Sequence, residues 1–167
     1  SGGFLVPWWP RAGSMTGRFE EAQVGDVLDG RYTLRRQIAR GGQGAVLEGE
    51  HRVTQARVAV KTLIRPALEM TEAHARLILE ARILGAVRHP GLVAIHDAGT
   101  CEKHGPYLVL EMIEGRPLDG ILLTRRKLPV GQAVAIVRQL CDALSEVHHH
   151  GIVHRDVKPA NLLIKAT

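Results

Sequence analysis

Alternation of apolar and polar residues with a period of two marks much of the chain from Arg31 onward. This period is typical of strands that bury one face. It predicts strands at Tyr32–Ile38, Val46–His51, Arg57–Leu63, Leu92–Ala98 and Tyr107–Met112. Prolines and glycines break any such period in Ser1–Asp29, so we expect a disordered leader there.

A helical period replaces the alternation in three segments. They cover Thr71–Val87, Leu118–Arg126 and Val130–His149. The first is closed by the turn sequence His89-Pro90-Gly91. Strands therefore come first with one helix inserted, and helices follow. This order predicts an α+β fold with two unlike lobes joined near Glu111–Gly115.

The composition excludes several classes of protein. With 45% hydrophobic residues, the chain has too much apolar content for a disordered protein. The formal charge is +5, but 22 basic residues are mixed with 17 acidic ones. Only Arg125–Lys127 forms a tight basic run, and no aromatic residue is interleaved with it. We therefore expect no nucleic-acid partner, because that binding requires a concentrated basic face.

The cysteines and the apolar runs indicate the cellular compartment in which this chain is expected. Cys101 and Cys141 lie far apart, which argues against a zinc site and a disulfide framework. Their spacing favours a reducing, cytoplasmic environment. No apolar run approaches the roughly 20 residues of a membrane span, so we expect no membrane segment in this chain.

Three glycines, Gly41, Gly42 and Gly44, lie between two predicted strands. Glycine lets backbone amides approach a phosphate closely, although a plain glycine-rich hairpin explains the pattern equally well. A P-loop is excluded because Ala45-Val46, not Lys-Ser or Lys-Thr, follows Gly44. A dinucleotide-binding fold is disfavoured because a strand, not a helix, is predicted next.

Lys61 and Glu80 form a candidate ion pair. Alternation along Arg57–Lys61 places Ala59 and Lys61 on one strand face, where the lysine can project over a ligand. On the predicted helix Thr71–Val87, Glu80 falls in the middle of an apolar arc. A carboxylate there needs a partner because its desolvation is costly, and Lys61 is the natural one. An exposed strand lysine and a purely structural salt bridge remain alternative interpretations.

The segment His154-Arg155-Asp156-Val157-Lys158-Pro159-Ala160-Asn161 carries the strongest signal. It places a carboxylate, a cation and an amide within six residues of a loop that contains proline. Such a set can accept a hydroxyl proton, neutralise a phosphoryl group and bind a magnesium ion.

On these motifs the chain resembles the protein kinase family, and the bacterial serine/threonine type in particular, from about Asp29 to Ile164. The glycine segment is similar to the family's phosphate loop, except that Ala39 replaces its first glycine. By this resemblance the loop comprises Ile38, Ala39, Arg40, Gly41, Gly42, Gln43, Gly44, Ala45 and Val46. The resemblance implies an antiparallel N-terminal lobe at 30–110, a hinge at 111–115 and the start of a helical lobe at 116–167.

The same resemblance implies roles for single residues. Lys61 would hold the α- and β-phosphates of ATP and Glu80 would position it. Leu110 would be the gatekeeper, and the backbone of Glu111 and Ile113 would meet the adenine edge. Leu163 would form the floor of the ATP pocket, with Ile38, Val46 and Ala59 as its roof. Asp156 would be the catalytic base, Lys158 would contact the γ-phosphate, and Asn161 would bind Mg²⁺.

The function implied is ATP-dependent phosphorylation of serine and threonine hydroxyls in protein substrates. The family pattern continues beyond Ile164 with Asp-Phe-Gly and further helices, so we expect the chain alone to be inactive. A non-catalytic nucleotide-binding or scaffolding module is the alternative, as is a truncated reading frame. The intact set of Lys61, Glu80, Asp156 and Asn161 argues against a degenerate site.

Overall fold

The computed structural model describes residues 4–5, 19–41, 44–63, 81, 85–154 and 156–165. Backbone contacts divide the chain into two units. Residues 11–85 and 95–112 form the first, called here the sheet unit. Residues 1–10, 86–94 and 113–167 form the second, called here the helical unit. The division at residues 112 and 113 falls within the expected hinge at 111–115.

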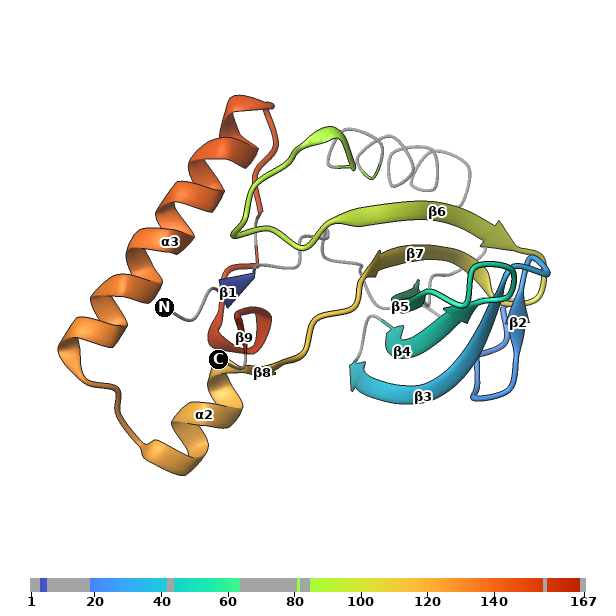
Figure 1. Ribbon diagram of the computed structural model, residues 1–167, viewed down its shortest axis with the longest axis horizontal. Coiled ribbons are helices and arrows are strands. Elements are labelled where there is room, and N and C mark those ends of the chain that lie inside the picture. The colour runs from blue at the N-terminus through green and yellow to red at the C-terminus, as the bar shows by residue number, and fades with distance from the viewer. Residues whose placement is uncertain are drawn as a thin grey trace. The chain divides into compact units, whose positions relative to one another are not determined.

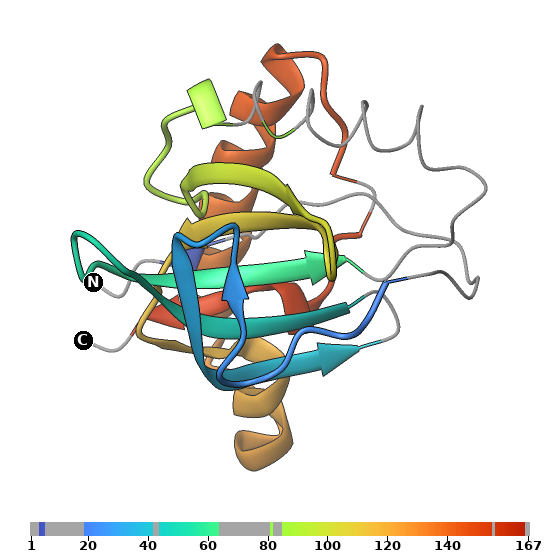
Figure 2. The same cartoon turned by 90° about the vertical axis from the view of Figure 1, so that its right-hand side faces the viewer.

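The sheet unit contains a six-stranded antiparallel sheet in the order β2-β3-β4-β5-β7-β6. Figure 2 shows β3, β4 and β5 side by side. The strands are β2 (Val27–Leu28), β3 (Tyr32–Gly41), β4 (Gly44–His51), β5 (Arg57–Leu63), β6 (Ile95–Cys101) and β7 (Gly105–Glu111). Strands were predicted for five of these six, so the alternating pattern identified most of the sheet.

Strand β6 differs from the predicted range Leu92–Ala98. It starts three residues later and runs to Cys101, which pairs with Gly105 of β7. The two strands form a hairpin closed by residues 102–104, so backbone pairing with β7 extends β6 up to the turn. Leu92 instead belongs to the turn after His89, whose carbonyl accepts a bond from the Leu92 amide at 3.0 Å.

Two segments expected from the sequence lie largely outside the described residues. The predicted helix at 71–87 lies almost entirely outside them, although residues 81, 85 and 86 are helical. Within the expected leader, residues 4–5 and 19–29 are described. Residues 27–28 form β2, and Ala22 and Leu28 are buried in the core, so residues 19–29 are folded.

The register separates two faces of the sheet, because residues paired across antiparallel strands point to the same side. One face forms the hydrophobic core of the sheet unit and is called here the core face. Its buried residues include Leu34, Ala45, Leu47, Val58, Val60, Cys101, Tyr107 and Val109. Val46, Ala59, Lys61, Leu108 and Leu110 pair in register on the other side, called here the second face.

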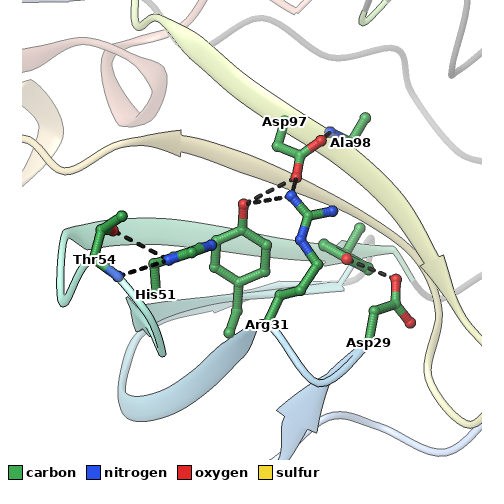
Figure 3. A network of polar contacts seen from close by, with 8 residues as sticks. Asp29, Arg31, His51, Thr54, Asp97 and Ala98 are labelled. Carbon is green, nitrogen blue, oxygen red and sulfur yellow. Dashed lines mark hydrogen bonds and ion pairs between the residues drawn. The ribbon is translucent and has the colours of Figure 1, made fainter.

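Side chains bridge β3 and β6, which are separated by three strands in the sheet order, so the sheet is curled. The Tyr32 hydroxyl donates to Asp97 Oδ2 at 2.9 Å. Arg31 forms an ion pair with the same carboxylate, and Figure 3 shows the two groups pointing toward one another. Tyr107 on β7 donates to Asp29 Oδ2 at 2.7 Å. These contacts join residues 29–32 to strands β6 and β7.

The helical unit contains two α-helices among the residues that the structure describes, α2 (Leu118–Arg125) and α3 (Val130–His149). The predicted bounds of α3 are confirmed, and α2 ends one residue before the predicted end. Figure 1 shows α3 as a long straight helix. No helix in the described part of the chain is long and apolar enough to cross a membrane.

A small sheet carries the end of the chain. Strand β9 (Leu163–Lys165) pairs with β8 (Gly115–Pro117) on one side and with β1 (Phe4–Leu5) on the other. The short 3-10 helix η2 (Pro159–Asn161) precedes β9. Asn161 is therefore the last residue of η2, two residues before the start of β9.

Candidate active site

The helical unit brings Asp156, Lys158 and Asn161 together in one cluster. Lys158 Nζ donates to Asp156 Oδ2 at 2.8 Å. Asn161 Nδ2 lies 3.0 Å from the same carboxylate oxygen and 2.8 Å from the backbone carbonyl oxygen of Asp156. The Asp156 side chain is 6% exposed, whereas that of Lys158 is 49% exposed. A shielded carboxylate is therefore held by two donors, one of which reaches solvent.

The backbone around this cluster is fixed by the local sequence. Pro159 starts η2, where its missing amide hydrogen is not needed. The Asn161 amide bonds back to the Lys158 carbonyl at 2.9 Å, and the Leu118 amide bonds to the Leu162 carbonyl at 2.8 Å. Helix α2 and η2 therefore position the amide side chain of Asn161 against the Asp156 backbone.

Lys61 lies on the second face of the sheet unit, paired with Val46 on β4 and Leu108 on β7. Ala59 lies two residues away on the same face, paired with Leu110. The predicted placement of Ala59 and Lys61 on one strand face is therefore confirmed. Lys61 is only 4% exposed. A lysine so enclosed must have its charge compensated.

The glycine segment is the tip of the β3–β4 hairpin. Arg40 pairs with Ala45, and Gly41 pairs with Gly44. Gly44 has φ = +135°, a conformation that side chains rarely allow. The structure thus places Gly41 at the end of β3 and Gly44 at the start of β4, whereas Gly42 and Gln43 between them lie outside the described residues.

The remaining expected site residues are placed separately in the two units. Leu110 is buried near the end of β7, and Glu111 ends that strand. Ile38 lies at a register irregularity of β3 and is 42% exposed. In the helical unit, Ile113 is half-buried and Leu163 starts β9. Glu80 lies outside the described residues, so its pairing with Lys61 stays a prediction.

Asn161 fits the oxygen chemistry that magnesium prefers. Its two hydrogen bonds both go to oxygen acceptors, so they must use the amide nitrogen. The amide oxygen Oδ1 is then the atom that can bind a cation. Among the described residues, no group of three or more histidine, cysteine, aspartate or glutamate side chains could hold a metal ion. Asn161 Oδ1 is therefore a candidate ligand for the magnesium ion of a bound nucleotide.

The sequence interpretation gave no role to His154 or Leu108, which the structure places beside the candidate residues. His154 is 2% exposed, and its Nδ1 accepts a hydrogen bond from the Asp156 amide at 3.3 Å. His154 therefore helps to fix the backbone that carries the carboxylate. Leu108 packs on the second face next to Lys61, a position that only the β5–β7 register reveals.

Comparison with known proteins identifies the family. Residues 32–167 match the sequence model described as "Protein kinase domain". Serine/threonine-protein kinase PknA of Mycobacterium tuberculosis is 40% identical over 149 residues, covering 87% of this chain and 35% of PknA. Serine/threonine-protein kinase pkn2 of Myxococcus xanthus is 39% identical over 138 residues, covering 83% of this chain and 16% of that protein. The chain therefore spans about a third or less of these relatives.

Solved structures agree with this assignment. The kinase domain of Mycobacterium tuberculosis PknI superposes with a TM-score of 0.75 at 27% identity, covering 87% of this chain and 58% of that domain. A double mutant of the same domain gives a TM-score of 0.78. The antiparallel sheet followed by α2 and α3 is the kinase arrangement that the sequence predicted. The chain belongs to the protein kinase family, and its relatives are bacterial serine/threonine kinases.

Proposed function

We propose that the protein containing this chain transfers the γ-phosphate of ATP to serine and threonine hydroxyls of protein substrates. The cluster of Asp156, Lys158 and Asn161 carries this proposal. A carboxylate, a cation and an amide oxygen are joined there by hydrogen bonds within one loop, and each has a chemical use in phosphoryl transfer.

Asp156 orients the substrate hydroxyl and accepts its proton. Two donors hold its Oδ2, so the carboxylate keeps one orientation. Fixed orientation matters because phosphoryl transfer depends mainly on positioning and electrostatic stabilisation. Lys158 is half exposed, so its ammonium group can reach a phosphate while it remains near Asp156.

Lys61 and the glycine hairpin bind the nucleotide. The lysine neutralises the α- and β-phosphates, and Ala59 leaves room beside it for the ligand. Backbone amides of the Gly41–Gly44 hairpin approach the phosphates without side chains between them. Asn161 Oδ1 would help to hold a magnesium ion, and that ion would supply positive charge where charge develops on the phosphates.

The serine/threonine specificity rests on Lys158, which resembles the lysine of that kinase class, and on the names of the relatives. A cytoplasmic location, where ATP and a reducing environment are available, remains a prediction from the two cysteines. Cys101 is buried and Cys141 is exposed, and both are free thiols in the structure.

The test is an assay of the full-length protein with MgATP and a generic protein substrate, followed by analysis of the phosphorylated amino acids. We expect phosphoserine or phosphothreonine and no phosphotyrosine. Phosphotyrosine would refute the assigned specificity. Tight ATP binding without any transfer would favour the non-catalytic scaffold instead, and absence of both would refute the proposal.

A further inference from the structure

Residues Phe19–Asp26, called here the strap, run along the sheet unit ahead of β2. The strap is fastened to β3 by backbone bonds, from the Gly25 amide to the Leu34 carbonyl at 2.8 Å and from the Leu34 amide to the Asp26 carbonyl at 2.9 Å. Ala22 is 5% exposed and belongs to the hydrophobic core. The strap is thus an integral part of the sheet unit.

His104, in the turn between β6 and β7, contacts both ends of the strap. Its Nδ1 lies 2.9 Å from the Glu20 carbonyl oxygen, and its Nε2 lies 3.3 Å from Asp26 Oδ2. The His104 side chain is only 3% exposed. The Glu20 amide also donates to the Lys103 carbonyl at 3.0 Å. Residues on both sides of Glu21 are therefore fixed to the sheet unit.

Glu21 reaches from this fixed segment to the base of the glycine hairpin. Its Oε2 lies 2.6 Å from Arg40 Nη2. Arg40 is the last residue of β3 before Gly41, so it carries the last side chain that can hold the hairpin from that strand. Arg40 pairs with Ala45, which lies on the core face. The contact therefore holds the hairpin from the side opposite Lys61.

We propose that Glu21 is a positioning residue for the nucleotide, and that it acts by holding Arg40 and thereby the glycine hairpin in place. This inference rests on the proposed binding of ATP by that hairpin. It assigns a function to a segment that the sequence pattern suggested was a disordered leader. The pair is exposed on the arginine side, at 62%, so its effect is modest. We expect MgATP affinity to fall about two- to fivefold without the pair.

The experiment compares MgATP binding by isothermal titration calorimetry in the full-length protein and its variants. Glu21→Gln removes the charge without changing the size of the side chain. Arg35→Gln is the matched control. Arg35 lies on β3, like Arg40, but far from the glycine hairpin, and it forms an ion pair with Glu50 at 3.0 Å. The Arg35 and Arg40 side chains are similarly exposed, at 53% and 62%.

We expect weaker MgATP binding and a higher KM for ATP with Glu21→Gln, an unchanged kcat, and no change with Arg35→Gln. Glu21→Gln should have no further effect when combined with Arg40→Gln, and the exchange Glu21→Arg with Arg40→Glu should restore affinity. Equal losses in Glu21→Gln and Arg35→Gln would overturn the inference, because the effect would then be general. Unchanged affinity in Glu21→Gln, with the wild type binding normally, would also overturn it. Failure of the wild type to bind MgATP would instead refute the proposed function.

Discussion

Replacing Tyr107 with phenylalanine tests how much the hydrogen bond between Tyr107 and Asp29 stabilises the sheet unit. Tyr107 is 1% exposed, and its hydroxyl donates to Asp29 Oδ2 at 2.7 Å. Removing a hydrogen bond to a charged group costs about 1.5–3 kcal/mol when the partner stays buried. Asp29 is exposed and can bind water instead, so we expect a loss of about 1–2 kcal/mol in the free energy of unfolding at pH 7.

The same variant should change how stability depends on alkaline pH. Burial, followed by the hydrogen bond to Asp29, raises the pKa of Tyr107 well above its ordinary value. Above about pH 10 the unfolded chain releases this proton while the folded chain keeps it, so stability falls as pH rises. The slope is about 1.4 kcal/mol per pH unit for one tyrosine. Burial and the hydrogen bond to Asp97 likewise raise the pKa of Tyr32, which also makes stability fall as pH rises.

Urea unfolding of wild type and Tyr107→Phe between pH 7 and about 11 measures both effects. Circular dichroism follows unfolding, and difference absorbance at 295 nm follows tyrosinate formation. In the variant the alkaline slope should decrease by about 1.4 kcal/mol per pH unit. Parallel pH profiles for the two proteins would refute the assigned burial and hydrogen bonding of Tyr107.

Two further predictions concern the surface of each unit. The apolar face of α3 is exposed at Val134 (60%) and Val137 (56%), so the 167-residue chain alone should self-associate; Val134→Glu with Val137→Lys should reduce this in light scattering. Unchanged association would show that another surface drives it. Hydrogen bonds from Arg36 and Arg57 lower the pKa of Glu48. The contribution of Glu48 to the free energy of unfolding is therefore present above the ordinary glutamate pKa and is lost as pH falls through the lowered pKa. Glu48→Gln should therefore cost about 0.5–1 kcal/mol at pH 7 and flatten the acid limb of the unfolding curve, whereas an unchanged acid limb would contradict the assigned pairing.

Periodicity identified most elements because their burial is regular. Strand β5 has one face in the core and the other around Lys61, which matches the alternation in its sequence. Helix α3 has a long repeated pattern that ends before Gly151, whose φ is +73°. Strand β6 was displaced by three residues because pairing with β7, not its own pattern, sets its ends. A strand's own periodicity does not encode where its pairing with the neighbouring strand begins and ends.

The sequence singled out the local motif of the candidate site but not the strap. Asp156, Lys158 and Asn161 lie within six residues, so a local motif revealed them, and the structure adds the hydrogen bonds that join them. The strap gave no such signal. Its contacts with His104 and Arg40 join residues that are distant in sequence, and its polar composition resembles that of a loop. Such contacts follow only from the assembled sheet.

The most direct test of the central claim is the effect of Asp156→Asn on phosphoryl transfer in the full-length protein, with MgATP binding measured in the same preparation. Asp142→Asn, an exposed substitution on α3, is the matched control. If Asp156 accepts the substrate proton, kcat should fall by about 10²–10⁴-fold while the Kd for ATP and the control stay near wild type. Undiminished turnover in Asp156→Asn would contradict the account.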